Sequence, residues 1–232
     1  MNSTSQQFIS RLLVLATALC ASSVAFAHGV AGSDAAYVAS SRGVNVFPFM
    51  YLGAKHMVTG YDHLLFLAGV IFFLYRLKDV ALYVTLFAIG HSTTLLAGVL
   101  GNIHANAYIV DAIIGLSVAY KAFENLGGFR KLGWQIDTRV AVLAFGFAHG
   151  FGLATKLQEL SLSPEGLAAN LVSFNVGVEL GQLAALGIIL LAFNFWRRSR
   201  SFLSGAWTAN VLIMAAGFVL IGYQLAGYWR GA

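Results

Sequence analysis

The sequence predicts an all-α protein, a polytopic bundle of transmembrane helices, from its composition and the length of its apolar blocks. Of its 232 residues 59% are hydrophobic and 10% charged, and the mean hydropathy is +0.77. Soluble domains contain about 45–50% apolar and about 25% charged residues. The apolar blocks are about 20 residues long and lack alternating polarity, which is typical of membrane helices and not of barrel strands.

The first 27 residues are predicted to be a cleaved signal peptide, with residues 1–27 as a separate segment. They contain a polar start with Arg11, an apolar stretch and the small-x-small sequence Ala25-Phe26-Ala27. An uncleaved first membrane helix is the alternative, although the apolar stretch is short for a span. Cleavage would remove Cys20, the one cysteine of the chain. It would leave His28 first, where its amino group and imidazole could chelate a metal ion.

The mature chain is expected to have an exterior segment over residues 28–45 and a six-helix transmembrane domain over residues 46–232. The six apolar blocks cover residues 46–75, 80–100, 107–123, 139–157, 167–195 and 206–229. Nine of the 14 Lys and Arg residues flank the first, third and fifth connections. The positive-inside rule therefore places both mature termini outside, on the periplasmic side of a bacterial inner membrane. Because these cations are expected to flank membrane helices, the net charge of +5 does not indicate a nucleic-acid partner.

Ionisable residues inside the spans are the candidate functional residues, because a charge at mid-bilayer costs a few kcal/mol or more. Several lie at similar depth and are expected to meet near the midplane. The candidate metal ligands are His56, Asp62 and His63 in the first span, His91 in the second, His149 in the fourth, Glu179 in the fifth, and His28 at the mature amino terminus.

A continuous first helix would fix the relation between the first three of these residues. His56 and His63 would lie on one face, about 10 Å apart along the axis. Asp62 would point away from that face, toward a second helix contact or a histidine that it orients. Asp111, near the outer end of its span, is expected to cap its helix or face water, and Lys121 and Glu124 are expected to snorkel.

The donor set indicates the class of metal. Imidazoles with one or two carboxylates and no thiolate suit borderline divalent ions such as Ni, Co, Zn or Cu(II). Imidazole pairs could instead ligate haem iron. A single histidine could also serve an interhelical hydrogen bond. Glycine pairs beside the candidates, Gly146 with Gly150 and Gly177 with Gly181, are expected to let neighbouring helices approach closely.

Two short matches favour an internal repeat. Gly60-Tyr61-Asp62-His63 resembles Gly146-Phe147-Ala148-His149, and the segment from Phe87 to His91 resembles the segment from Phe174 to Glu179. If the first three and last three spans are repeats, the odd number of spans makes them inverted, a three-plus-three arrangement that places transporter sites between the halves.

The motif His56-x5-Asp62-His63, after His28-Gly29, resembles the HupE/UreJ family. His149-Gly150 and the segment from Asn175 to Gln182 resemble later motifs of that family. The first motif is also similar to the His-x4-Asp-His signature of nickel/cobalt permeases, with one extra residue that rotates His56 by about 100°. The resemblance implies secondary uptake of nickel or cobalt through His56, Asp62 and His63, in association with hydrogenase or urease maturation.

Together these features predict a protein that is not an enzyme, a secondary permease for a divalent transition-metal ion, nickel or cobalt before zinc or copper. Its expected partners are the ion, the lipid bilayer and metalloenzyme maturation proteins. The sequence has no nucleotide-binding motif, so the membrane potential is the expected driving force, at about 2.3 kcal/mol per charge per 100 mV. The alternatives are a membrane metalloenzyme or haem protein that keeps its metal, and a chaperone that hands metal to a partner.

Overall fold

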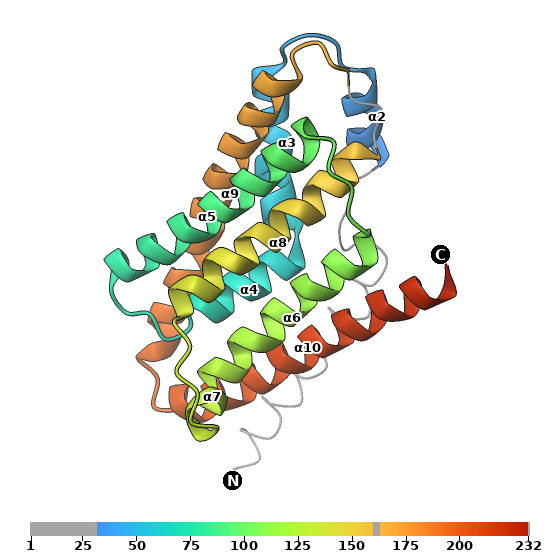
Figure 1. The fold of residues 1–232 in the computed structure, drawn as a ribbon. Helices are drawn as coiled ribbons and strands as arrows, with labels where there is room; N and C mark the ends of the chain where they lie inside the picture. Colours follow the sequence, from blue (N-terminus) through green and yellow to red (C-terminus); the bar gives the residue numbers. More distant parts are fainter. Residues whose placement is uncertain (1–31, 160–162, 232) are drawn as a thin grey trace.

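The computed structural model describes residues 32–159 and 163–231, and within these ranges every regular element is a helix (Figure 1). The helices are α2 (Gly32–Ser40), α3 (Val46–Thr59), α4 (Tyr61–Ile71), α5 (Leu77–Leu100), α6 (Ala107–Asn125), α7 (Gly128–Lys131), α8 (Thr138–Gln158), α9 (Leu167–Arg197) and α10 (Phe202–Arg230). The predicted all-α class is confirmed for this part of the chain. The predicted signal peptide, Cys20 and His28 lie outside the described residues.

Four of the described helices, α5, α8, α9 and α10, are long and apolar enough to cross a membrane. Their bounds agree with the predicted blocks to within a few residues at most ends. Helix α6 covers the block predicted at 107–123, but it carries the charged residues Asp111, Lys121 and Glu124. Length and composition alone therefore do not mark α6 as a span.

The block predicted at 46–75 is two helices and not one, because the chain leaves helical geometry at Gly60. This residue has φ −75° and ψ 97°, and it ends α3 and begins α4. A Cβ atom at Gly60 would lie 3.0 Å from His63 Nδ1 and 3.1 Å from the carbonyl oxygen of His56. The ring of His63 and the carbonyl group of His56 thus leave little room for a side chain at this turn, which favours glycine.

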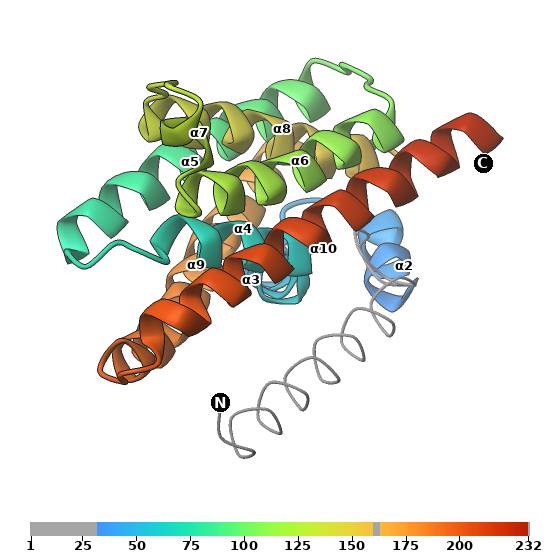
Figure 2. The ribbon, with the colours of Figure 1, turned by 90° about the horizontal axis from the view of Figure 1, so that it is seen from below.

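The helices of the bundle pack mainly in three pairs, α3 with α9, α5 with α8, and α6 with α10. Helix α6 lies between α8 and α10 (Figures 1 and 2). The backbones approach closely in each pair. A Cβ atom on Gly146, Gly181 or Gly217 would lie 2.6–2.7 Å from a backbone atom of the partner helix. The expected close packing at the two glycine pairs beside His149 and Glu179 is confirmed.

Buried ion pairs compensate the charges of α6. Asp111 accepts a hydrogen bond from Lys156 of α8 at 3.0 Å, and Lys121 donates to Glu124 at 2.7 Å. Asp111 is 6% exposed and Lys121 7%. The expectation that Asp111 caps a helix or faces water is therefore wrong, and Lys121 is paired inside the bundle instead of snorkelling to its surface.

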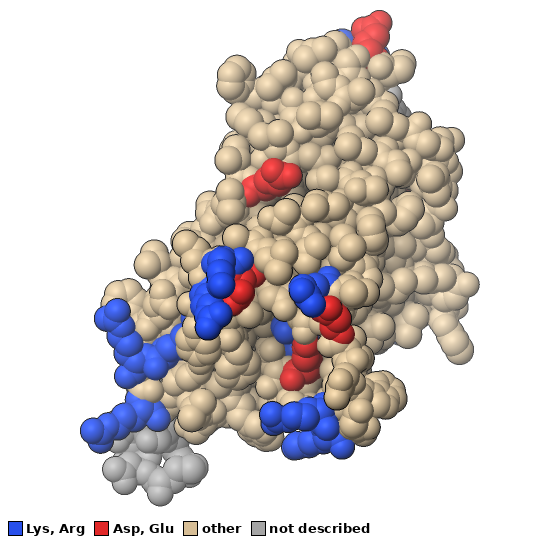
Figure 3. All heavy atoms as spheres, turned by 60° about the vertical axis from the view of Figure 1, so that its left-hand side comes forward, with Lys and Arg blue, Asp and Glu red and all other residues tan. Residues whose placement is uncertain are grey.

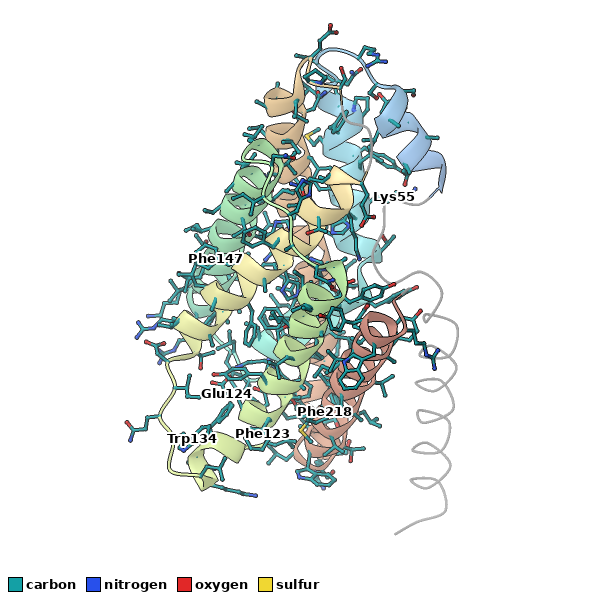
Figure 4. All side chains as sticks on the ribbon, turned by 45° about the vertical axis from the view of Figure 1, so that its right-hand side comes forward. Lys55, Phe123, Glu124, Trp134, Phe147 and Phe218 are labelled. Carbon is teal, nitrogen blue, oxygen red and sulfur yellow. The ribbon has the colours of Figure 1, made fainter. Side chains whose placement is uncertain are left out.

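Charged residues lie toward the two ends of the bundle. Lys55 lies beside α2, where it forms an ion pair of 2.7 Å with Asp34, whereas Glu124 lies toward the other end of the bundle (Figure 4). On the face where α5 and α9 lie, Lys and Arg gather toward the lower end and the upper part is almost without charge (Figure 3). The interior of the bundle holds several buried polar side chains, among them those described next.

Candidate metal centre

Four histidines from four helices meet in the interior, with His63 at the centre. The ring centroid of His63, in the first turn of α4, lies 5.2 Å from that of His56 on α3 and 6.0 Å from that of His91 on α5. It lies 4.8 Å from that of His149 on α8. His63, His91 and His149 are each at most 1% exposed. We call these four residues and Asp62 the histidine cluster.

Three members of the cluster have the spacing of a metal site. One potential ligand atom each from Asp62, His63 and His149 lies within 4.8 Å of the others, and all three residues are buried. Asp62 stands in the first turn of α4, where the positive end of the helix dipole favours a carboxylate. Buried carboxylate and imidazole donors are the combination that a borderline divalent cation prefers.

Hydrogen bonds select the tautomers of two of the rings. His149 Nδ1 lies 2.8 Å from the carbonyl oxygen of Phe145, which can only accept, so Nδ1 carries the proton. His63 Nδ1 lies 3.2 Å from Asp62 Oδ1, and an ionised carboxylate likewise accepts. Each neutral ring is therefore left with the lone pair on Nε2, the atom that would bind a metal ion.

The break at Gly60 changes the geometry expected of the first motif. A continuous helix would separate His56 and His63 by about 10 Å and turn Asp62 away from them. In the structure the two rings are 5.2 Å apart, and Asp62 contacts the adjacent His63. The break explains the approach of the two rings. The expectation that Asp62 points away from His63 is also wrong, because these two neighbours in the first turn of α4 are in direct side-chain contact.

Aromatic rings surround the cluster. The Phe87 ring lies 5.0 Å from that of His149, 6.1 Å from that of His91 and 6.3 Å from that of His63. The Phe66 ring lies 5.4 Å from that of His149. Both phenylalanines are at most 1% exposed. They exclude water from the imidazoles, which strengthens their electrostatic interactions with an ion.

The remaining predicted ligands do not join the cluster. Glu179 is exposed on the surface of α9 and lines a groove between α9 and α5. His28 lies outside the described residues, so its part in a site stays a prediction. His104, the remaining histidine of the described residues, is exposed in the connection between α5 and α6.

Several features of the bundle interior were not predicted from the sequence. The spacing of Phe87 four residues before His91 places both on one helix face, and this could have identified it. The pairing of Asp111 with Lys156 left no local signal, because 45 residues separate them. Gln182 is 1% exposed although it lies in a predicted span, and a buried amide in a membrane helix is itself a signal.

A bundle of long apolar helices with a buried cluster of imidazoles and a carboxylate defines an integral membrane protein with the donors of a metal site. The chain belongs to the HupE/UreJ family, since a family model described as HupE / UreJ protein matches residues 32–231, nearly its whole length. The resemblance drawn from the His56, Asp62 and His63 motif is thereby confirmed. The family indicates a metal-related accessory or transport role. No curated protein and no solved structure matches the chain.

Proposed function

We propose that this chain is a secondary permease that carries a divalent transition-metal ion, nickel or cobalt before zinc or copper, through the histidine cluster. One observation carries the proposal: potential ligand atoms of Asp62, His63 and His149 lie within 4.8 Å of one another, buried among apolar helices. An ionisable group inside a membrane span marks a functional site by default, and three that converge from two helices mark it more strongly.

The ligand chemistry suits transient binding. His63 and His149 supply neutral nitrogen donors, and Asp62 supplies one negative charge against the two positive charges of the ion. His56 and His91 lie next to His63 and can take over as ligands when the ion moves. The site then holds the ion by exchange among neighbouring donors, which is what passage requires and what a closed structural site lacks.

The proposal includes six membrane spans. Helices α3 and α4 together contain 14 and 11 residues, about 38 Å of helix, which exceeds the hydrocarbon thickness of about 30 Å. Their junction at Gly60 is a discontinuous span of the kind that binds ions in transporters. Helix α6, with 19 residues, has its charges compensated by ion pairs. The positive-inside rule then orients both ends toward the periplasm of a bacterial inner membrane.

The pairing of helices supports an inverted three-plus-three repeat. In such a repeat α3/α4 corresponds to α8, α5 to α9, and α6 to α10. The α3–α9 pair then corresponds to the α8–α5 pair, and the α6–α10 pair corresponds to itself, as the observed helix contacts require. The matched segments that end at His63 and His149 also meet, with ring centroids 4.8 Å apart. This arrangement is expected of a site between inverted halves.

Metal uptake by cells tests the function. Cells that produce the wild type should accumulate radioactive nickel or cobalt above cells with an empty vector, and His63→Ala should abolish the difference. His104→Ala, a change of an exposed loop histidine, is the matched control and should leave uptake unchanged. Equal accumulation by the wild type and His63→Ala, at equal protein levels in the membrane, would reject transport through the cluster.

The role in hydrogenase or urease maturation is a further part of the proposal, drawn from the family. Imported nickel would then reach maturation proteins in the cytoplasm. Deleting the gene should lower the activity of the metalloenzyme at limiting nickel, and added nickel should restore it. Failure of added nickel to restore activity would favour direct transfer from this chain to a partner.

A further inference from the structure

The end of α4 that points away from the histidine cluster is held by side chains of two neighbouring helices. Arg197, the last residue of α9, donates from Nη2 to the carbonyl oxygens of Ile71 at 2.7 Å and Phe72 at 2.8 Å. Asn125 of α6 donates to the carbonyl oxygen of Gly69 at 2.8 Å. The last carbonyl groups of a helix have no partner within it, and in a membrane protein they need one. These bonds therefore fix the end of α4.

The other end of α4 is the break at Gly60, where the chain leaves helical geometry. With 11 residues, α4 is about 16 Å long and short enough to move as one unit. Hinges are residues at the ends of elements that absorb changes of φ and ψ. A half-helix with a break at one end and side-chain hydrogen bonds at the other can turn about the break when those bonds open.

The hold that Arg197 provides is a charge–dipole interaction and not an ion pair. In the described part of the chain no carboxylate lies within 4.0 Å of its guanidinium. Its Cζ atom lies 4.5 Å from the centroid of the Tyr75 ring, a side chain that is 67% exposed. The carbonyl oxygens at the end of a helix carry its negative partial charge, which a cation stabilises. The hold can thus open without leaving a carboxylate unpaired.

Packed aromatic rings close the same end of the bundle. The ring centroid of Phe72 lies 4.9 Å from that of Phe193, 5.8 Å from that of Trp196 and 6.1 Å from that of Phe202. We call these four residues the inner aromatic cluster. Phe72 is 1% exposed and follows His63 by nine residues, about 14 Å along the helix. The connection from α9 to α10 lies at the lower end of the bundle, away from α2 (Figure 1). An ion that leaves the histidine cluster along α4 therefore meets these rings.

We propose that Arg197 and the inner aromatic cluster form a gate at the cytoplasmic end of the bundle. Arg197 holds α4 in the closed position. When its bonds to the Ile71 and Phe72 carbonyl oxygens open, α4 turns about Gly60, withdraws Phe72 from the rings of α9 and α10, and opens a way from the histidine cluster. The passage of a metal ion through this gate, and the side on which it lies, rest on the proposed function; the hold on α4 does not.

Hydrogen–deuterium exchange of the purified, metal-free protein in lipid nanodiscs tests the hold. With Arg197→Met we expect the amides of residues 68–74 to exchange at least about tenfold faster than in the wild type, because the freed end of α4 frays. Exchange in α5 should not change. Arg197→Lys keeps a cation with several donors, so its exchange should fall between these two. Arg198→Met, which removes the exposed neighbouring arginine, is the matched control and should exchange as the wild type does.

Thiol labelling tests the opening. The chain has one cysteine, Cys20, so a Cys20→Ser background with Leu67→Cys carries a single thiol. Leu67 is 1% exposed and lies one turn after His63, between the histidine cluster and the end of α4. In inside-out membrane vesicles a membrane-impermeant maleimide should label this thiol at least about tenfold faster with Arg197→Met than with Arg198→Met.

Three outcomes would overturn the gate. The first is exchange at the end of α4 that is the same in Arg197→Met, Arg198→Met and the wild type. The second is faster exchange without faster labelling from the cytoplasmic side, which would make Arg197 a packing residue only. The third is labelling that becomes faster only in right-side-out vesicles. Failure of nickel uptake by the wild type would reject the permease but leave both measurements valid, because neither uses the metal.

Discussion

The imidazoles of His63 and His149 lie with their centroids 4.8 Å apart, although 86 positions separate the two residues in the sequence. Each ring is held through Nδ1, by Asp62 in one case and by the Phe145 carbonyl oxygen in the other. Two histidines with Nε2 as the remaining donor atom, brought together by tertiary packing, form the core of the proposed metal site.

Removing either ring should weaken metal binding more than removing any other histidine. We expect His63→Ala and His149→Ala to lower nickel affinity at least about tenfold, since even the outer partners of metal ligands cause losses of 10–100-fold. Equilibrium dialysis of purified protein measures the affinity. His104→Ala should bind nickel as the wild type does, and unchanged binding by His63→Ala would contradict the assigned centre.

Release of the metal should be easy. A permease binds its ion transiently, so dialysis of nickel-loaded protein against a chelator should leave less than one ion per chain and no haem absorbance. Reloading should restore the original stoichiometry. Metal or haem that stays bound through this treatment would favour a metalloenzyme or haem protein over a permease.

The close approach of α5 and α8 predicts a strong effect of a methyl group at Gly146. Its Cβ atom would lie 2.6 Å from the carbonyl oxygen of Phe87, so the helices must separate. We expect Gly146→Ala to destabilise the protein by about 1–3 kcal/mol and to weaken metal binding, because His149 lies one turn away. Unfolding in detergent measures the stability.

Gly187→Ala is the matched control for this change, since nothing lies within 4 Å of the added atom. It should be neutral or slightly stabilising, because alanine favours helix over glycine. Equal destabilisation by the two substitutions would contradict the prediction that the close helix packing at Gly146 excludes a side chain.

Removing one partner of the buried ion pair between Asp111 and Lys156 should destabilise the protein strongly. Asp111→Asn leaves the Lys156 ammonium without its partner, and we expect a loss of about 3–5 kcal/mol in unfolding free energy. Replacing both residues, as in Asp111→Leu with Lys156→Met, should recover much of the loss. Lys55→Met, which removes the more exposed pair with Asp34, should change the unfolding free energy much less, because solvent screens an exposed ion pair.

The start of α8 predicts a stability change in acid. Hydrogen bonds from the Arg139 side chain and backbone hold the pKa of Asp137 below its usual range. A lowered pKa in the folded state means that ionised Asp137 stabilises the protein at neutral pH. This contribution should fade as the pH falls below about 4 and should be absent in Asp137→Asn. Chemical unfolding of both proteins from pH 7 to pH 3 compares them; identical pH profiles would contradict the assignment.

The sequence was sufficient for the helices and for much of the site. Long apolar blocks predicted α5, α8, α9 and α10, because a helix that crosses the bilayer needs about 20 apolar residues. The similar depth of His63, His91 and His149 in their predicted spans indicated that they meet, and in the structure they do. The turn at Gly60 could not be foreseen, since a glycine in an apolar block does not by itself break a helix. This turn brings His56 of α3 close to His63 of α4.

Glu179 shows the other limit of the sequence. Its depth matches that of the histidines, but depth says nothing about the direction of a side chain around its helix. The face that α9 presents to α3 is set by Gly177 and Gly181, which pack against the backbone of α3. That packing turns Glu179 toward α5 and the surface groove.

The pairing of helices divides the donors into two half-sites. His91 and His149 belong to α5 and α8, which the contacts at Gly90 and Gly146 join backbone to backbone. His56, Asp62 and His63 belong to the broken span that packs on α9 through α3. A displacement of one pair against the other would leave each half-site intact and separate them from one another. For the proposed permease, such a displacement would take all the ligands of one half-site away from the ion together, which is one way in which a small relative motion could release it.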